Sequence, residues 1–112
     1  MPGPALAHHS GAMFDSTREV RLVGVIKVFR WSNPHAWIEI DVPDSAGKPV
    51  TWSVEMTSPS ILSGDGWKRS TLLVGDRVTL FVSPLRDGKP GGSFVGVKLS
   101  DGRWLGRGEP RT

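Results

Sequence analysis

Four segments of the chain alternate apolar and polar residues, and this period of two constrains the fold more than any other feature. They are residues 35–42 (HAWIEIDV), 49–56 (PVTWSVEM), 77–82 (RVTLFV) and 93–99 (SFVGVKL). Successive side chains of a strand point to opposite faces, so the alternation predicts half-buried β-strands. Their apolar positions should face the core; in the last two segments these are Val78, Leu80, Val82, Val95, Val97 and Leu99.

A fifth strand is predicted at residues 20–31 (VRLVGVIKVFRW), which are β-branched and apolar on both parities. Such a segment suits a long strand shared by two sheets, and Gly24 in its middle indicates a bend or bulge. After the third segment, Ser58 as N-cap and Pro59 at the first helical position predict a helix, which Gly64 and Gly66 keep short.

The order of elements is therefore three strands, one short helix and two strands. This is the order of the OB-fold, so we expect an all-β protein with one short helix, folded as a five-stranded OB-like Greek-key barrel. Fourteen Gly and nine Pro among 112 residues fit short strands joined by turns. An open sandwich or roll is the alternative that the pattern leaves.

The length of the chain predicts one domain, which we place at residues 8–105. Residues 106–112 are rich in Gly, Arg and Pro and are expected to form a flexible tail. In residues 1–7, Ala5-Leu6-Ala7 has the small residues of a signal-peptidase site, which indicates a signal-peptide remnant or a short leader. The chain has no apolar run of membrane-spanning length, so we expect no membrane insertion.

The amino-acid composition excludes several kinds of catalytic and metal site. The chain has no Cys, which excludes thiol catalysis, iron–sulfur clusters and cysteine zinc sites. No nucleophile-elbow pattern frames any Ser, so we expect no enzyme activity. The net charge of +3 is small, and acidic residues on the outward hairpin face would repel phosphates, so we expect no nucleic-acid partner.

The three histidines, His8, His9 and His35, are the candidate metal ligands. If processing exposes the α-amine of His8, that amine and its imidazole can chelate one ion, and His9 or His35 would add a further nitrogen. Nitrogen donors in this number favour copper(II). The alternative is structural: His8 and His9 in an unattached terminus, and His35 hydrogen-bonded to the turn that follows Asn33-Pro34.

A second candidate site is the outward face of the hairpin formed by residues 35–56. Trp37, Glu39, Ser53 and Glu55 share the parity opposite the aliphatic core. An exposed Trp beside carboxylates can stack on a sugar or an aromatic ring. Glu55 is also a candidate fourth metal ligand or a hydrogen-bond partner of a ligating His. Alternatively, this face is solvated and a loop covers Trp37.

Several motifs together resemble a family of uncharacterised small bacterial secreted proteins with a His-His-Ser start and an Asn-Pro-His-x-Trp motif. They are AHHS at 7–10, WSNPHAWI at 31–38, WSVEMTSP at 52–59 and VGDRVT at 74–79. The chain departs from the pattern in lacking an apolar leader and in having Gly11 where an aromatic residue is usual. The resemblance implies a periplasmic or secreted protein.

Together these features predict a binding protein for a metal ion, copper first. A small-molecule or sugar ligand on the Trp37 and Glu55 face, or a non-catalytic accessory protein that presents a surface to a partner, are the alternatives.

Overall fold

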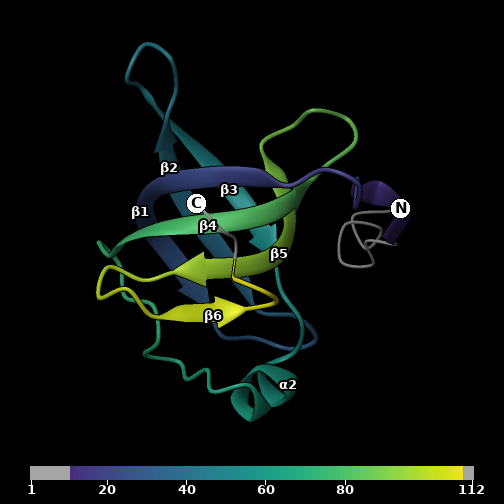
Figure 1. Ribbon diagram of the computed structural model, residues 1–112, viewed down its shortest axis with the longest axis vertical. Helices are drawn as coiled ribbons and strands as arrows, with labels where there is room; N and C mark the ends of the chain where they lie inside the picture. The colour runs from purple at the N-terminus through teal and green to yellow at the C-terminus, as the bar shows by residue number, and fades with distance from the viewer. Residues whose placement is uncertain (1–10, 110–112) are drawn as a thin grey trace.

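The strands of the computed structural model, which describes residues 11–109, close into a small barrel (Figure 1). In chain order the elements are η1 (Gly11–Met13, a 3-10 helix), β1 (Val20–Arg30), β2 (Trp37–Pro43), β3 (Pro49–Glu55), α2 (Pro59–Gly64), β4 (Arg77–Pro84), β5 (Gly91–Lys98) and β6 (Trp104–Gly106). Each strand predicted from the alternation is present, with ends displaced by at most two residues. The predicted class, all-β with one short helix, is confirmed.

One parallel pairing closes the barrel. The strands follow the order β3-β2-β1-β4-β5-β6, and every neighbouring pair in this order is antiparallel. In addition, β3 pairs with β5 in parallel through Ser53 with Gly91 and Glu55 with Ser93. The first five strands therefore form the predicted OB-like barrel rather than an open sandwich or roll, and β6 extends the sheet at the outer edge of β5.

The long strand β1 pairs with two neighbours within one six-stranded sheet, rather than being shared by two sheets as the sequence predicted. Residues 20–25 pair with β4 and residues 25–30 pair with β2. The register with β2 shifts between Ile26 and Val28, so Lys27 is the extra residue of a bulge. The bulge exchanges the two faces: Leu22 and Ile26 are buried before it, and Phe29 packs against the core after it. This exchange explains how Phe29 reaches the core from the parity opposite to that of Leu22 and Ile26, whereas Val23, on the same parity as Phe29 but before the bulge, is exposed.

Gly24 allows a close approach of strands and does not itself form the bulge. A Cβ atom at this position would lie 2.2 Å from the carbonyl oxygen of Asp41. Only a residue without a side chain fits there, because non-bonded carbon and oxygen atoms do not approach so closely.

A second bulge overturns one predicted core position. The register between β4 and β5 shifts so that Phe81 faces Gly96 and Val82 faces Phe94. Val95 is therefore the extra residue, and Phe94 packs against the core in its place. The alternation alone predicted Val95 inward, which is wrong, because a bulge reverses the parity of every residue that precedes it on the strand.

The core fills the barrel from the inward positions of its strands. Ile38, Ile40, Val54, Leu80, Val82 and Val97 are fully buried. Helix α2 lies beyond one end of the barrel (Figure 1). It begins as predicted, with the Ser58 hydroxyl accepting a hydrogen bond from the Ile61 N–H at 3.3 Å. Within residues 11–109, no helix is long and apolar enough to cross a membrane.

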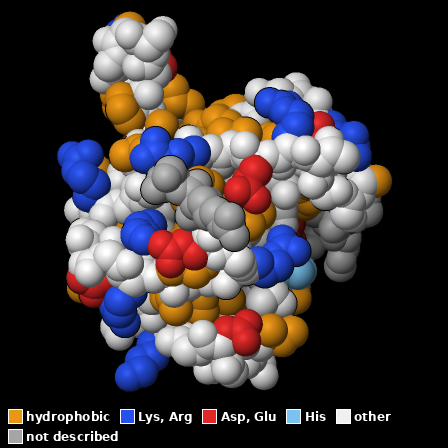
Figure 2. All heavy atoms as spheres, in the orientation of Figure 1, with side chains coloured by type: hydrophobic (Ala, Val, Ile, Leu, Met, Phe, Trp, Pro, Cys, Tyr) orange, Lys and Arg blue, Asp and Glu red, His pale blue; other side chains and the backbone are white. Residues whose placement is uncertain are grey.

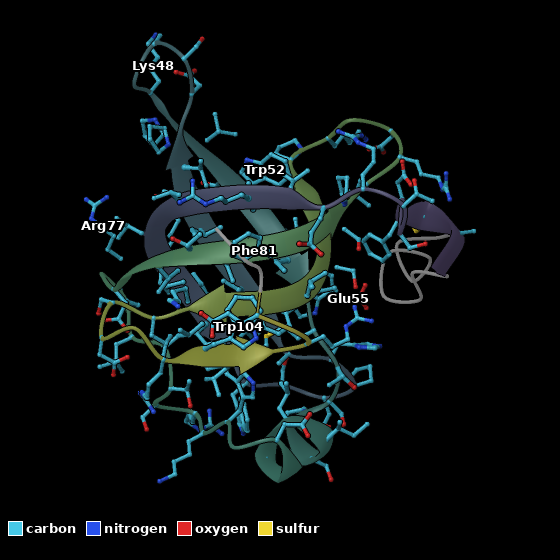
Figure 3. All side chains as sticks on the ribbon, viewed as in Figure 1. Lys48, Trp52, Glu55, Arg77, Phe81 and Trp104 are labelled. Carbon is cyan, nitrogen blue, oxygen red and sulfur yellow. The ribbon has the colours of Figure 1, made fainter. Side chains whose placement is uncertain are left out.

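Aromatic rings pack together at two places, against the core around Trp67 and on the outer face of the sheet around Trp104. Trp67, which follows α2, is buried and has its ring centroid 5.8 Å from that of Phe29 and 5.5 Å from that of Phe94. Trp104 of β6 lies against Phe81, with ring centroids 5.6 Å apart (Figure 3). Its indole also covers Gly96, where a Cβ atom would lie 2.2 Å from the ring.

Substituting Gly24 tests the close approach of β1 and β2. Gly24→Ala should lower the free energy of unfolding by about 1–3 kcal/mol, because the new methyl group would force the strands apart. Gly64→Ala is the matched control, since a Cβ atom there meets nothing within 4 Å. The measurement is urea unfolding followed by tryptophan fluorescence. Equal stability of the two variants would contradict the steric explanation.

Candidate functional site

The loop between β1 and β2 fixes the orientation of the His35 ring. Nδ1 of His35 lies 2.8 Å from the carbonyl oxygen of Met56. A carbonyl oxygen only accepts hydrogen bonds, so Nδ1 carries the hydrogen and donates it. The backbone is held by bonds from the Met56 N–H to the Ala36 oxygen at 2.9 Å and from the Ser32 hydroxyl to the His35 oxygen at 2.9 Å. When the ring is neutral, Nε2 therefore keeps the lone pair that a metal ion needs.

Nε2 of His35 faces a buried carboxylate. It lies 3.5 Å from Oε2 of Glu55, whose side chain is 8% exposed against 38% for that of His35. His35 is the one histidine among residues 11–109, and its side chain reaches the molecular surface (pale blue in Figure 2). If a metal ion lay about 2.0–2.2 Å from both atoms, the angle between Nε2, the ion and Oε2 would be about 115°. The spacing of the two atoms would allow both of them to bind one ion.

No third ligand joins this pair within the described part of the chain. Residues 11–109 contain no group of three or more His, Cys, Asp or Glu side chains that could hold a metal ion. His8 and His9, the other two predicted metal ligands, lie outside the described residues. Of the predicted histidine site, the structure thus describes His35 alone, together with Glu55 as its neighbour.

The chain enters the described structure beside this pair. Gly11 lines the same cleft as His35 and Glu55. The segment is tied to the β4–β5 loop, where Arg86 donates from its backbone N–H to the Met13 oxygen and from Nε to the Ala12 oxygen, both at 2.9 Å. These bonds fix where the first ten residues connect to the barrel.

Hydrogen bonds also hold the turn that follows, at Asp15 and Thr17. Both the hydroxyl and the backbone N–H of Thr17 donate to the Asp15 carboxylate, and these bonds hold the pKa of Asp15 below its usual value. The Asp15 N–H in turn donates to the Pro84 oxygen at 2.8 Å. The carboxylate is therefore the form of Asp15 that stabilises this entry to the barrel.

The cleft itself is large and is walled by apolar and polar side chains in similar numbers. Its volume is about 740 Å³, and it lies between the barrel and α2. Glu55 is at the end of β3, on the side of the barrel where η1 lies (Figure 3). The apolar lining includes Phe14, Met56, Leu62, Trp67, Phe94 and Val95, and the charged lining includes Asp65 and Arg107. Sequence reasoning missed Trp67 and Phe94, because they come from separate elements and no motif connects them.

The predicted hairpin face is present but divided between two clefts. The register places Trp37 opposite Glu55 and Glu39 opposite Ser53, so the four residues share one face as the alternation predicts. Glu55 lines the large cleft, whereas the other three line a smaller one of about 270 Å³. His35 borders both clefts.

The smaller cleft has its own charged pair and hydroxyl groups. Nη2 of Arg30 lies 3.8 Å from Oε2 of Glu39. Both residues line the cleft, together with Ser32 and Ser53. Trp37 is half-buried rather than fully exposed. The arrangement offers one aromatic ring edged by polar groups, on a much smaller scale than the large cleft.

The geometry predicts the tautomer of His35. When the His35 ring is neutral, long-range ¹H–¹⁵N correlation spectra should show Nδ1 protonated and Nε2 unprotonated, because Nδ1 donates to the Met56 oxygen. Glu55→Gln should leave this tautomer unchanged, since the Met56 carbonyl selects it. A signal from protonated Nε2 in neutral His35 would contradict the assignment.

Comparison with known proteins finds one matching family. One family model matches residues 1–94, and its description is family of unknown function, DUF6152. No curated protein and no solved structure shows a significant match to the chain.

Proposed function

The chain belongs to the DUF6152 family of unknown function, and we propose that it is a periplasmic or secreted binding protein for a divalent transition-metal ion, copper(II) first. It acts by holding the ion and has no catalytic role. The observation that carries the proposal is the His35 ring, whose Nδ1–H is bound by the Met56 carbonyl while Nε2 faces Glu55.

This arrangement is the one found around metal-bound histidines. A ligating imidazole almost always donates its second nitrogen to a carbonyl or carboxylate, which fixes the tautomer and aims the free lone pair. In this protein the Met56 carbonyl supplies that contact before any ion arrives.

The remaining ligands are assigned to His8 and His9. His9 is two residues before Gly11, and two residues of chain span at most about 7 Å. Gly11 lines the cleft that contains His35 and Glu55. In a chain that begins at His8, the α-amine and imidazole of His8 add a chelate, and Ala5-Leu6-Ala7 is a suitable processing site.

Nitrogen donors support copper(II) over the other divalent ions by the general order of affinities. Copper(II) prefers ligands near 90°, which needs the two donor atoms about 2.9 Å apart at ordinary bond lengths. His35 Nε2 and Glu55 Oε2 lie 3.5 Å apart, so a small shift of either side chain brings them to the separation that copper(II) prefers.

Calorimetric titration of copper(II) tests the proposal. Protein that begins at His8 should bind one ion with a Kd of about 1 μM or tighter, and the full chain should bind more weakly, because its His8 amine is an amide. His35→Ala should weaken binding at least about tenfold. Trp37→Ala should leave it unchanged, since Trp37 offers no metal donor.

Electron paramagnetic resonance provides an independent readout, with nitrogen couplings expected from the bound ion. Zinc(II) titrated in parallel should bind more weakly. Absence of binding to the chain that begins at His8, or equal affinity in His35→Ala, would refute the metal site.

The smaller cleft supports a second candidate function, the binding of a neutral sugar. Its volume of about 270 Å³ suits one ring, with Trp37 for stacking and Arg30, Glu39 and the Ser53 hydroxyl for hydrogen bonds. Trp37→Ala should abolish chemical-shift changes caused by monosaccharides while leaving copper(II) binding intact. If sugars cause no shifts in the unaltered protein, this candidate is rejected.

A further inference from the structure

The barrel has an apolar mouth at the end away from α2, and we infer that this mouth binds a neutral, apolar molecule of one or two rings. The mouth is a cleft between the β2–β3 hairpin and the β4–β5 loop, and both of these lie at the end of the molecule opposite to α2 (Figure 1). It shares no lining residue with the two clefts that His35 borders, so the inference is independent of the proposed metal function.

The mouth exists because the β2–β3 hairpin extends past its neighbouring strands. The pairing of β1 with β2 reaches only to Asp41, and the pairing of β5 with β3 begins only at Ser53. Beyond these points, residues 42–43 and 49–52 pair across the hairpin. The side chains on the core-facing side of this extension therefore face a gap between the hairpin and the β4–β5 loop.

The walls of the mouth keep part of their apolar surface open. Val42, Val50 and Trp52 line it from the hairpin, and all three are half-buried rather than enclosed in the core. Pro43 and Pro90 are exposed on its two sides, and hydrophobic side chains gather at the base of the hairpin in Figure 2. Only the floor, which includes Leu22 at 3% exposed, is buried.

The two ends of the barrel differ in how completely they are closed. At the end near α2, Leu62 and Trp67 pack into the core and are each 3% exposed. At the mouth, Val42 and Trp52 pack against the core but remain partly in contact with solvent. A ligand that covers them removes apolar surface from water, which is favourable without any charged contact.

The charged groups around the mouth favour neither sign of ligand. Asp44 lines the mouth, and its Oδ1 accepts two backbone N–H groups of its own turn at 2.8 and 2.9 Å. Lys48 lies across that turn, whereas Asp87 and Lys89 lie in the opposite loop, where Asp87 Oδ1 accepts the Lys89 N–H at 2.9 Å. Arg86 donates from Nε to the entry segment instead. Two lysines and two aspartates therefore flank the mouth, and a neutral ligand is desolvated there at the lowest cost.

Prolines at the rim favour a small molecule over an added peptide strand. A strand that extends a sheet needs N–H and C=O groups along the edge to which it binds. Pro49 of β3 and Pro90 of the loop have no N–H group, so this edge is a poor template. The volume of the mouth, about 400 Å³, lies within the 300–1,000 Å³ typical of small-molecule sites, and the mouths of β-barrels are a common place for them.

Four small rings provide the test: cyclohexanol, cyclohexylamine, cyclohexanecarboxylate and glucose. Each is titrated separately into the full chain in EDTA, and the indole N–H signals are followed in ¹H–¹⁵N spectra. Cyclohexanol should shift the Trp52 signal to saturation and should bind at least about threefold more tightly than either charged ring. Added salt should change its affinity by less than about twofold, because no charge attraction is involved. Glucose should leave the Trp52 signal unchanged.

Matched variants assign the binding to the mouth. Val50→Thr should weaken cyclohexanol binding at least about threefold, because a hydroxyl group replaces a methyl group in the wall. Val23→Thr is the control and should bind as the unaltered protein does, since Val23 is 38% exposed on β1 and does not line the mouth. If Val50→Thr fails to fold, Val42→Thr makes the same change at its cross-strand partner.

Three results would overturn the inference: no shift of the Trp52 signal with cyclohexanol, equal or tighter binding of a charged ring, or equal affinity in the wall variant and in Val23→Thr. A fourth is a Trp52 signal that moves with protein concentration in the absence of ligand, together with dimers in analytical ultracentrifugation. A second copy of the chain would then occupy the mouth in place of a small molecule.

Discussion

The parallel pairing of β3 with β5 is the constraint on which the rest of the structure depends. Without it the six strands would form an open sheet with two free edges; with it, five of them enclose one core. The pairing brings the two backbones close together at Gly91, where a Cβ atom would lie 3.1 Å from the Ser53 oxygen of β3. The same pairing places Glu55 beside Ser93 and so positions the carboxylate at the large cleft.

Two bulges adapt the strands to this closed form. Lys27 in β1 and Val95 in β5 are each an extra residue, and each exchanges the faces of its strand. The first brings Phe29 to the core, and the second brings Phe94 there and moves Val95 outward. Phe29 and Phe94 then flank Trp67, which forms the aromatic wall next to α2. The features that curve the barrel thus also build the cleft.

The cleft lies where three chain segments converge. The entry segment brings Gly11 and Phe14, the end of β3 brings Glu55, and β5 brings Phe94. His35 joins them from the β1–β2 loop, oriented by the Met56 carbonyl one residue beyond β3. The proposed metal site follows from this convergence, through the orientation of the His35 ring.

Local patterns in the sequence predicted the parts of this site that belong to one hairpin. Strict alternation placed Ile38 and Ile40 inward and Trp37 and Glu39 on the other face, because the side-chain period of a strand is fixed by its backbone. The start of α2 was equally predictable, since an N-cap Ser followed by Pro satisfies the helix terminus locally. The inward position of Val95 was wrong for lack of such a local signal: its bulge arises from pairing with β4.

The sequence by itself therefore determined the five barrel strands, most of their faces, the helix and the OB-like order of elements, because each depends on residues adjacent in the chain. Only the tertiary structure decided that Glu55 is buried and faces His35 Nε2, and that Trp67 and Phe94 wall a cleft beside them. These contacts join residues far apart in the chain. Their geometry is set by how the barrel closes, and strand periodicity carries no information about closure.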